Sequence, residues 1–200
     1  MVASAGSSGG GGRSDRSRGK LIKAAKALLW ERGYAAVSPR DIQKKAGVGQ
    51  GSFYHHFDRK ADLAGAALAE VAERMKADLN QQFDRARPPL DRVRGWLDRP
   101  RDGANGCRLG RLAFDAGMGE PQVREPVAEY LIHLEGCLVE ALAEALRGGD
   151  LKSGTDVEAV AEALIACVQG GYVVARAQGD PDVLQSTLNG ARVLLEGVTR

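Results

Sequence analysis

The segment SPRDIQKKAGVGQGSFYHHFDRK, residues 38–60, contains two short helical patterns that share one turn. Ser38, Pro39 and Asp41 mark the start of the first helix, with a capping hydroxyl, a proline at the first helical position and an acidic residue three positions after the cap. Gly47 is placed to end that helix in a left-handed conformation. The segment therefore predicts a helix-turn-helix, whose second helix can enter a DNA major groove.

The second helix is expected over residues 49–57 and has two different faces. The apolar side chains of the segment are spaced to pack inward, and they are Ile42, Ala46, Val48, Phe53 and Phe57. The side chains left on the outer face are Gln50, Gly51, Ser52, Tyr54 and His55. Gln50 can pair with an adenine edge, and Ser52 can exchange a hydrogen bond with a base or touch a thymine methyl group. We therefore expect this face to read bases.

Groups suited to phosphate surround this outer face. They are Ser38 and Arg40 at the start of the first helix, Tyr54 and His55 on the second, and Lys60 in the first turn of the next helix. The pair His55 and His56 also suggests a metal site. Adjacent helical residues point about 100° apart, however, so we predict that they do not chelate one ion.

The charge distribution points to a polyanion at one end of the chain. Residues 13–60 hold 12 Lys and Arg against 4 Asp and Glu, a net charge of +8, whereas the remaining residues hold 16 against 22, a net charge of −6. A basic segment beside an acidic body is typical of nucleic-acid binding, although a solvated basic face without a partner is the alternative.

The rest of the chain shows helical periodicity, with no strand alternation and no repeat. Helical spacing begins near Ser17, and Gly33 is a plausible left-handed end of the first helix. After a helix that starts near Asp58, further helices are expected over 89–98, 107–117, 121–147, 156–178 and 181–197. Thr155 and Glu158 are interpreted as a capping box. We predict an all-α fold of about nine helices, with a Gly/Ser-rich disordered tail at 1–14, a helix-turn-helix domain at 15–60 and a helical bundle at 61–200.

The composition indicates the cellular compartment in which the protein works. The three cysteines at positions 107, 137 and 167 form no disulfide framework and suit a reducing cytosol. The chain has no run of about 18 consecutive apolar residues and no apolar core of signal-peptide length. We therefore expect a cytoplasmic protein with no membrane partner.

The stretch from about residue 17 to 65 resembles the N-terminal domain of TetR-family transcriptional regulators. The residues that carry the resemblance are Ser38, Asp41, Ile42, Ala46, Gly47, Val48, the run Gly51–Phe57, Lys60 and Leu63. The resemblance implies a repressor that binds an operator in double-stranded DNA, with Gln50, Gly51 and Ser52 reading bases and Tyr54, His55 and Lys60 contacting the backbone. This chain departs from the family pattern at two positions. Gly49 stands where the family usually has Ser or Thr, and Gln50 stands where the family often has a basic residue.

The body resembles, more loosely, the electrophile-sensing branch of that family, like the repressor of N-ethylmaleimide reductase. The resemblance lies in the run NGCRLGRLA at 105–113 and in QGGY at 169–172. It implies that Cys107 senses electrophiles. Cys107 is expected near a helix N-terminus and beside Arg108, and both features favour the thiolate. The alternative is a buried cysteine that only packs, which is our expectation for Cys137 and Cys167.

A noncovalent effector is the other possibility for 61–200, interpreted as an effector-binding and dimerisation domain. Side chains that are candidates for a pocket, or else for plain core, are Trp96, Phe114, Met118, His133 and Tyr172. The last two long helices are expected to pair with those of a second subunit as a four-helix bundle.

Two other classes of protein compete with this interpretation. Cys107 and His133 would be the nucleophile and base of an enzyme, but the sequence supplies no oxyanion site, orienting group, phosphate loop or metal cluster. We therefore expect no catalysis, no cofactor and no metal. A helical adaptor for other proteins is the second competitor, and it predicts no binding to DNA.

Overall fold

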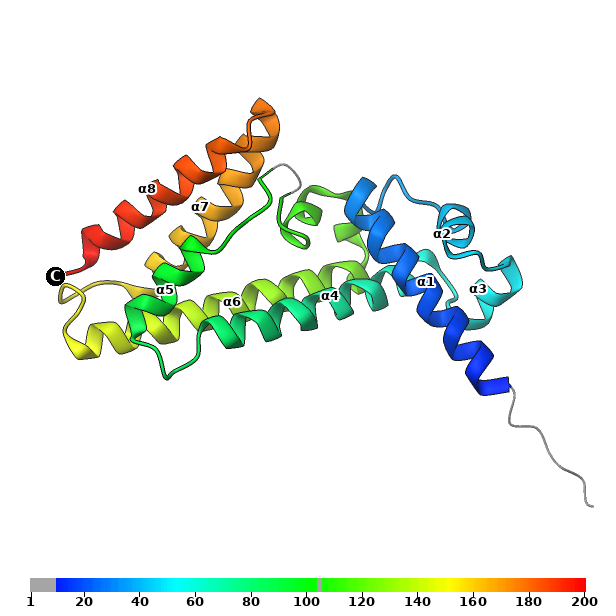
Figure 1. Cartoon of the computed structure of the whole chain (residues 1–200), viewed down its shortest axis with the longest axis horizontal. Coiled ribbons are helices and arrows are strands. Elements are labelled where there is room, and N and C mark those ends of the chain that lie inside the picture. Colours follow the sequence, from blue (N-terminus) through cyan, green and yellow to red (C-terminus); the bar gives the residue numbers. More distant parts are fainter. Residues whose placement is uncertain (1–9, 104–105) are drawn as a thin grey trace, which may run out of the picture. The chain divides into compact units, whose positions relative to one another are not determined.

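The computed structural model describes residues 10–103 and 106–200, which form eight α-helices and two short 3-10 helices (Figure 1). The described ranges contain no β-strand, only an isolated bridge between Leu151 and Thr199. The all-α prediction is confirmed. Of the tail expected at 1–14, residues 1–9 lie outside the described ranges, whereas residues 10–14 belong to the first helix, α1 (Gly10–Arg32).

The chain divides into two compact units. The first, called the head, comprises the described part of Met1–Val71 together with Leu112–Pro126, and the second, called the body, comprises Ala72–Arg111 and Val127–Arg200. This division differs from the single boundary expected near residue 60. Helix α4 (Lys60–Gln82) crosses from one unit to the other, and a segment distant in sequence joins the head.

Three helices of the head pack together around the predicted helix-turn-helix. Helices α2 (Pro39–Ala46) and α3 (Gln50–His56) both pack on α1 and on each other. Leu21, Ile42 and Phe53 are at most 1% exposed, and they form the apolar centre of the unit. Burial of side chains of this size stabilises the fold by about 1.5–3 kcal/mol each.

The body contains α5 (Pro89–Asp98), α7 (Val157–Gln178), α8 (Asp182–Val198) and most of α6 (Pro121–Gly148). Helices α7 and α8 lie side by side along their length, and α5 packs against α8 (Figure 1). Ion pairs support the second contact, since Arg94 binds Glu196 at 2.8 and 3.0 Å and Arg192 binds Asp98. Helix α7 is the one described helix that matches a membrane span in length and composition, a test that core helices also pass.

The helix expected over 107–117 is not formed. The chain instead makes two 3-10 helices, η1 (Gly110–Phe114) and η2 (Ala116–Gly119). Glycines at positions 110 and 117 weaken an α-helix, and Asp115 caps η2 by accepting a hydrogen bond from the Gly117 N–H at 2.8 Å. The Thr155–Glu158 capping box is also wrong: Asp156 caps α7, while the Thr155 hydroxyl donates to Lys152 O.

Candidate functional site

Local interactions fix both ends of α2, the helix that precedes the turn. Ser38 caps α2 by accepting from the Asp41 N–H at 3.2 Å, and the Asp41 carboxylate accepts from the Ser38 N–H at 2.9 Å and from its hydroxyl at 2.6 Å. These hydrogen bonds from Ser38 lower the pKa of Asp41. Gly47 ends α2 with φ of 62°, a left-handed conformation that glycine adopts without strain. The predicted capping box and glycine stop are confirmed.

Helix α3 has one buried and one exposed face. Phe53 is completely buried, and Phe57 is 6% exposed. Gln50, Gly51 and His55 are exposed, Tyr54 is 52% exposed and Ser52 is half-buried. The Phe53 and Tyr54 rings meet edge to face at 5.1 Å between centroids, so the buried ring supports the exposed one. The orientation required of a base-reading helix is therefore present.

The phosphate-binding candidates differ in their availability. Arg40 is exposed on α2, whereas the Ser38 hydroxyl already donates to Asp41. The Lys60 ammonium donates to the carbonyls of Tyr34 and Val37 at 3.1 and 3.0 Å and lies 3.9 Å from the centre of the Tyr34 ring. Lys60 thus ties α4 to the loop after α1, and two of its three donors are already used.

Two residues of α1 join this surface and were not predicted. The Ser17 hydroxyl lies 2.8 Å from Nε2 of His56, and the Arg18 guanidinium lies 5.5 Å from the centre of the Phe57 ring. These contacts hold the beginning of α1 beside the end of α3, with the exposed Arg18 next to it. The helical pattern was expected to begin near Ser17, but only the tertiary fold identifies His56 as its partner.

The segment 112–126 packs on the loop between α1 and α2. Asp115 accepts hydrogen bonds from the Tyr34 N–H at 2.9 Å and the Ala35 N–H at 3.2 Å. Gly117 lies so close to the Tyr34 ring that a Cβ there would approach Cδ1 to 2.6 Å. Arg59 and Glu120 add a surface ion pair at 3.8 Å. The chain that follows Cys107 is therefore fastened to the head.

Cys107 itself lies in the body and is 9% exposed. Its sulfur accepts a hydrogen bond from the Gly110 N–H at 3.3 Å, so the expected contact with a helix start is here a contact with a 3-10 turn. Trp96, at 1% exposed, and the half-buried Tyr172 belong to the same unit. Burial raises the pKa of Tyr172 to about 12, with a further contribution from neighbouring Cys107.

The other predicted effector residues do not join this group. Phe114 is 83% exposed, so the expectation that it lines a pocket or fills the core is wrong; Phe114 and the half-buried Met118 both belong to the head. His133 on α6 bonds Asn80 at 2.8 Å and lies 3.8 Å from the sulfur of Cys137. The polar neighbours of His133 are therefore Asn80 and Cys137, and not Cys107, with which it was considered as a nucleophile–base pair.

Cys137 and Cys167 are half-buried free thiols. Burial raises the pKa of Cys137, which disfavours its thiolate. The expected role in packing thus holds in part for both residues. Cys107 is the most buried of the three cysteines.

Helix α2 is capped by Ser38 and ended by Gly47, and it is followed by α3, whose outer face is exposed. In an all-α chain this arrangement is that of a helix-turn-helix DNA-binding protein. The family model for the tetR family of bacterial regulatory proteins matches residues 21–67, and the model for the tetracyclin repressor-like C-terminal domain matches residues 83–191. The chain belongs to the TetR family of transcriptional regulators, which are not enzymes.

Individual relatives agree with this assignment. The transcriptional regulator AcuR of Cereibacter sphaeroides is 32% identical over 174 residues, which cover 83% of this chain and 79% of the relative. The solved regulatory protein TetR from Rhodobacter sphaeroides is 30% identical, with a TM-score of 0.74 over 88% of this chain and 96% of its own. The reduced form of Escherichia coli NemR shares the fold, with a TM-score of 0.77 at 20% identity over 88% of this chain and 95% of its own.

Proposed function

We propose that the protein is a cytoplasmic repressor that binds a palindromic operator as a homodimer and releases it when an effector binds or modifies the body. The observation that carries the proposal is the exposed outer face of α3 from Gln50 to His55, which the buried Phe53 holds in place. Gln50, Gly51 and Ser52 would read bases. Tyr54, His55, Arg40, Arg18 and the remaining donor of Lys60 would contact phosphates, whereas Asp41 already accepts from both donors of Ser38. Several curated relatives are named repressors, which supports this direction of control.

The body offers a surface for the second subunit. Large apolar side chains are exposed on both of the last two helices, at Val173 and Val174 of α7 and at Val193 and Leu194 of α8. Exposed apolar side chains grouped on adjacent helices are typical of subunit interfaces. Pairing of α7 and α8 with their copies gives a four-helix bundle, and dimeric helix-turn-helix proteins meet half-sites about 34 Å apart.

The path from effector to DNA would run through the chain between Cys107 and Asp115. A group attached to the Cys107 sulfur would disturb its hydrogen bond from Gly110, and with it the start of η1. The same segment continues to Asp115, which holds the backbone of Tyr34 and Ala35. Displacement of that loop, and of α4 through Lys60, would change how the recognition helices meet DNA. A tenfold loss of affinity requires only about 1.4 kcal/mol.

The binding of DNA is tested by fluorescence anisotropy with labelled fragments from the DNA that flanks the gene, and with scrambled fragments of the same length. We expect one flanking fragment to bind more tightly than its scrambled control, with affinity falling steeply as salt rises because phosphate counterions are released. Failure to bind any duplex in dilute buffer would refute the proposal. A helical adaptor is the protein class that such a result favours.

We expect Cys107→Ser to abolish release by N-ethylmaleimide while leaving affinity for the operator unchanged. The thiolate sulfur would add to a carbon of the maleimide double bond, a C–S bond would form, and the neighbouring carbon would take up a proton. The operator complex is titrated by anisotropy before and after treatment, with Cys137→Ser and Cys167→Ser as controls that still release DNA. Equal release from the wild type and Cys107→Ser would contradict thiol sensing and favour a noncovalent effector.

A further inference from the structure

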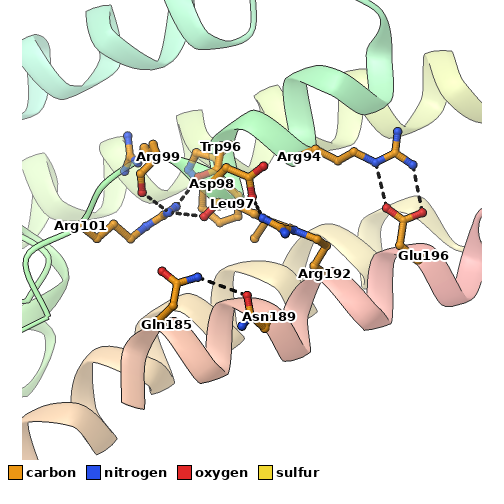
Figure 2. A network of polar contacts seen from close by, with 10 residues as sticks. All are labelled: Arg94, Trp96, Leu97, Asp98, Arg99, Arg101, Gln185, Asn189, Arg192 and Glu196. Carbon is orange, nitrogen blue, oxygen red and sulfur yellow. Dashed lines mark hydrogen bonds and ion pairs between the residues drawn. The ribbon is translucent and has the colours of Figure 1, made fainter. Parts of the chain in front are cut away.

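Arg101 follows the end of α5 and turns back onto that helix (Figure 2). Nη1 of its guanidinium donates to Leu97 O at 2.7 Å and to Arg99 O at 3.1 Å, and Nη2 donates to Trp96 O at 2.5 Å. The last carbonyls of a helix lack intrahelical partners and carry partial negative charge. Capping of α5 therefore explains the two terminal nitrogens of Arg101.

Capping leaves two buried donors unexplained. Nε of Arg101 and Nε1 of Trp96 are both buried, and neither has a hydrogen-bond acceptor in the described part of the chain. The two groups are neighbours, since the guanidinium carbon lies 5.1 Å from the centre of the Trp96 ring. Buried N–H groups almost always have an acceptor, so a neighbouring pair without one indicates that an acceptor other than the described residues belongs here.

The charge around this pair has the sign that an anion requires. Burial, followed by the positive charge of Arg99, lowers the pKa of Arg101 to about 10, so the side chain remains protonated near neutral pH. The other groups that act most strongly on Arg101 are Tyr172, Tyr130 and Cys107, and none of them is a carboxylate. The nearby Asp98 is paired with Arg192 of α8 (Figure 2). The excess positive charge is thus not neutralised by the protein groups that act on it most strongly.

We propose that Trp96 and Arg101 bind the carboxylate of a small organic acid, which is a noncovalent effector of this protein. A carboxylate offers two acceptor oxygens and one negative charge, which match two orphan N–H groups and a buried guanidinium. The rings of Trp96, Tyr130 and Tyr172 provide aromatic surroundings for the apolar part of the molecule. This inference rests on the proposed effector-sensing role of the body and names the class of ligand.

The test is calorimetric titration of the full chain with benzoate and propionate, and with benzamide and propionamide as uncharged molecules of matched shape. We expect at least one of the two acids to bind, and its amide to bind at least tenfold more weakly. Absence of binding by both acids, or equal binding of acid and amide, would overturn the proposal.

Two variants assign the binding to this pair of residues. Trp96→Phe keeps an aromatic ring and removes the orphan N–H together with part of the buried indole. Thermal unfolding is measured to show that the body remains folded, and we expect the folded variant to bind the acid at least tenfold more weakly. Trp30→Phe makes the same change in the head and should bind the acid as the wild type does. Arg101→Met should lose binding of the acid, but it also removes the cap of α5. Trp96→Phe is therefore the variant that tests whether the acid binds at this pair of residues. Wild-type affinity in Trp96→Phe would overturn the assignment.

The same samples separate this inference from the proposed function. Trp96→Phe is expected to bind operator DNA as the wild type does, and the acid is expected to weaken DNA binding by the wild type alone. Binding of DNA without binding of any acid would refute the carboxylate site and leave the regulator intact. Binding of the acid without binding of any duplex would refute the regulator and leave the site.

Discussion

Gly51→Glu is expected to lower affinity for the operator roughly 100-fold, which corresponds to about 2.7 kcal/mol. Gly51 is exposed on the outer face of α3, and a Cβ added there meets no heavy atom within 4 Å. The glutamate therefore fits without disturbing the head, and helix propensity favours it over glycine by roughly 0.5–1 kcal/mol. Its carboxylate would enter the surface that faces phosphates and base edges, where a negative charge is repelled.

This prediction is checked by anisotropy with the operator fragment, together with thermal unfolding to show that the head remains folded. Gly136→Glu is the matched control, because Gly136 lies on α6 in the body and a Cβ there also meets no neighbour within 4 Å. Gly136→Glu should bind DNA as the wild type does. If Gly51→Glu retains wild-type affinity while folded, α3 is not the surface that reads DNA.

The parts of the fold that the sequence predicted correctly depend on neighbours close in the chain. The cap at Ser38 and the stop at Gly47 involve residues at most four positions apart, and each can be recognised by its residue types alone. The same holds for the start of α5 at Pro89, where the helix expected over 89–98 begins. Apolar spacing then decided which side of α3 packs inward, because Phe53 and Phe57 are one helical turn apart.

The errors concern contacts between residues far apart in the chain. Asp115 bonds the backbone of Tyr34, which is 81 positions away, and this contact favours the 3-10 turns over the α-helix predicted at 107–117. The exposure of Phe114 follows from the same change of local structure. The hydrogen bonds from Lys60 to two carbonyls of the loop after α1 were likewise not foreseen, although its proposed contact with phosphate remains a prediction. Helical periodicity contains no information on such pairings.

Val193→Glu is expected to weaken the dimer at least roughly 100-fold, about 2.7 kcal/mol, and to lower affinity for the operator with it. Val193 is 71% exposed on α8, beside Leu194 at 56%, and both would be covered in the proposed four-helix bundle. A glutamate there would place an unpaired charge in an apolar interface, which is strongly unfavourable. In the monomer the same side chain remains in water, so the free energy of unfolding of the isolated chain should hardly change.

Sedimentation velocity over a range of protein concentrations measures the dimer directly, and anisotropy on the same samples measures DNA binding. Ile132→Glu is the matched control, since Ile132 is 66% exposed on α6, outside the proposed interface. It should remain dimeric. Two half-sites bound by one dimer reinforce each other through their effective concentration, so a monomeric variant should bind a single half-site as weakly as it binds the full operator. A Val193→Glu protein that sediments as a dimer would place the subunit contact elsewhere in the chain.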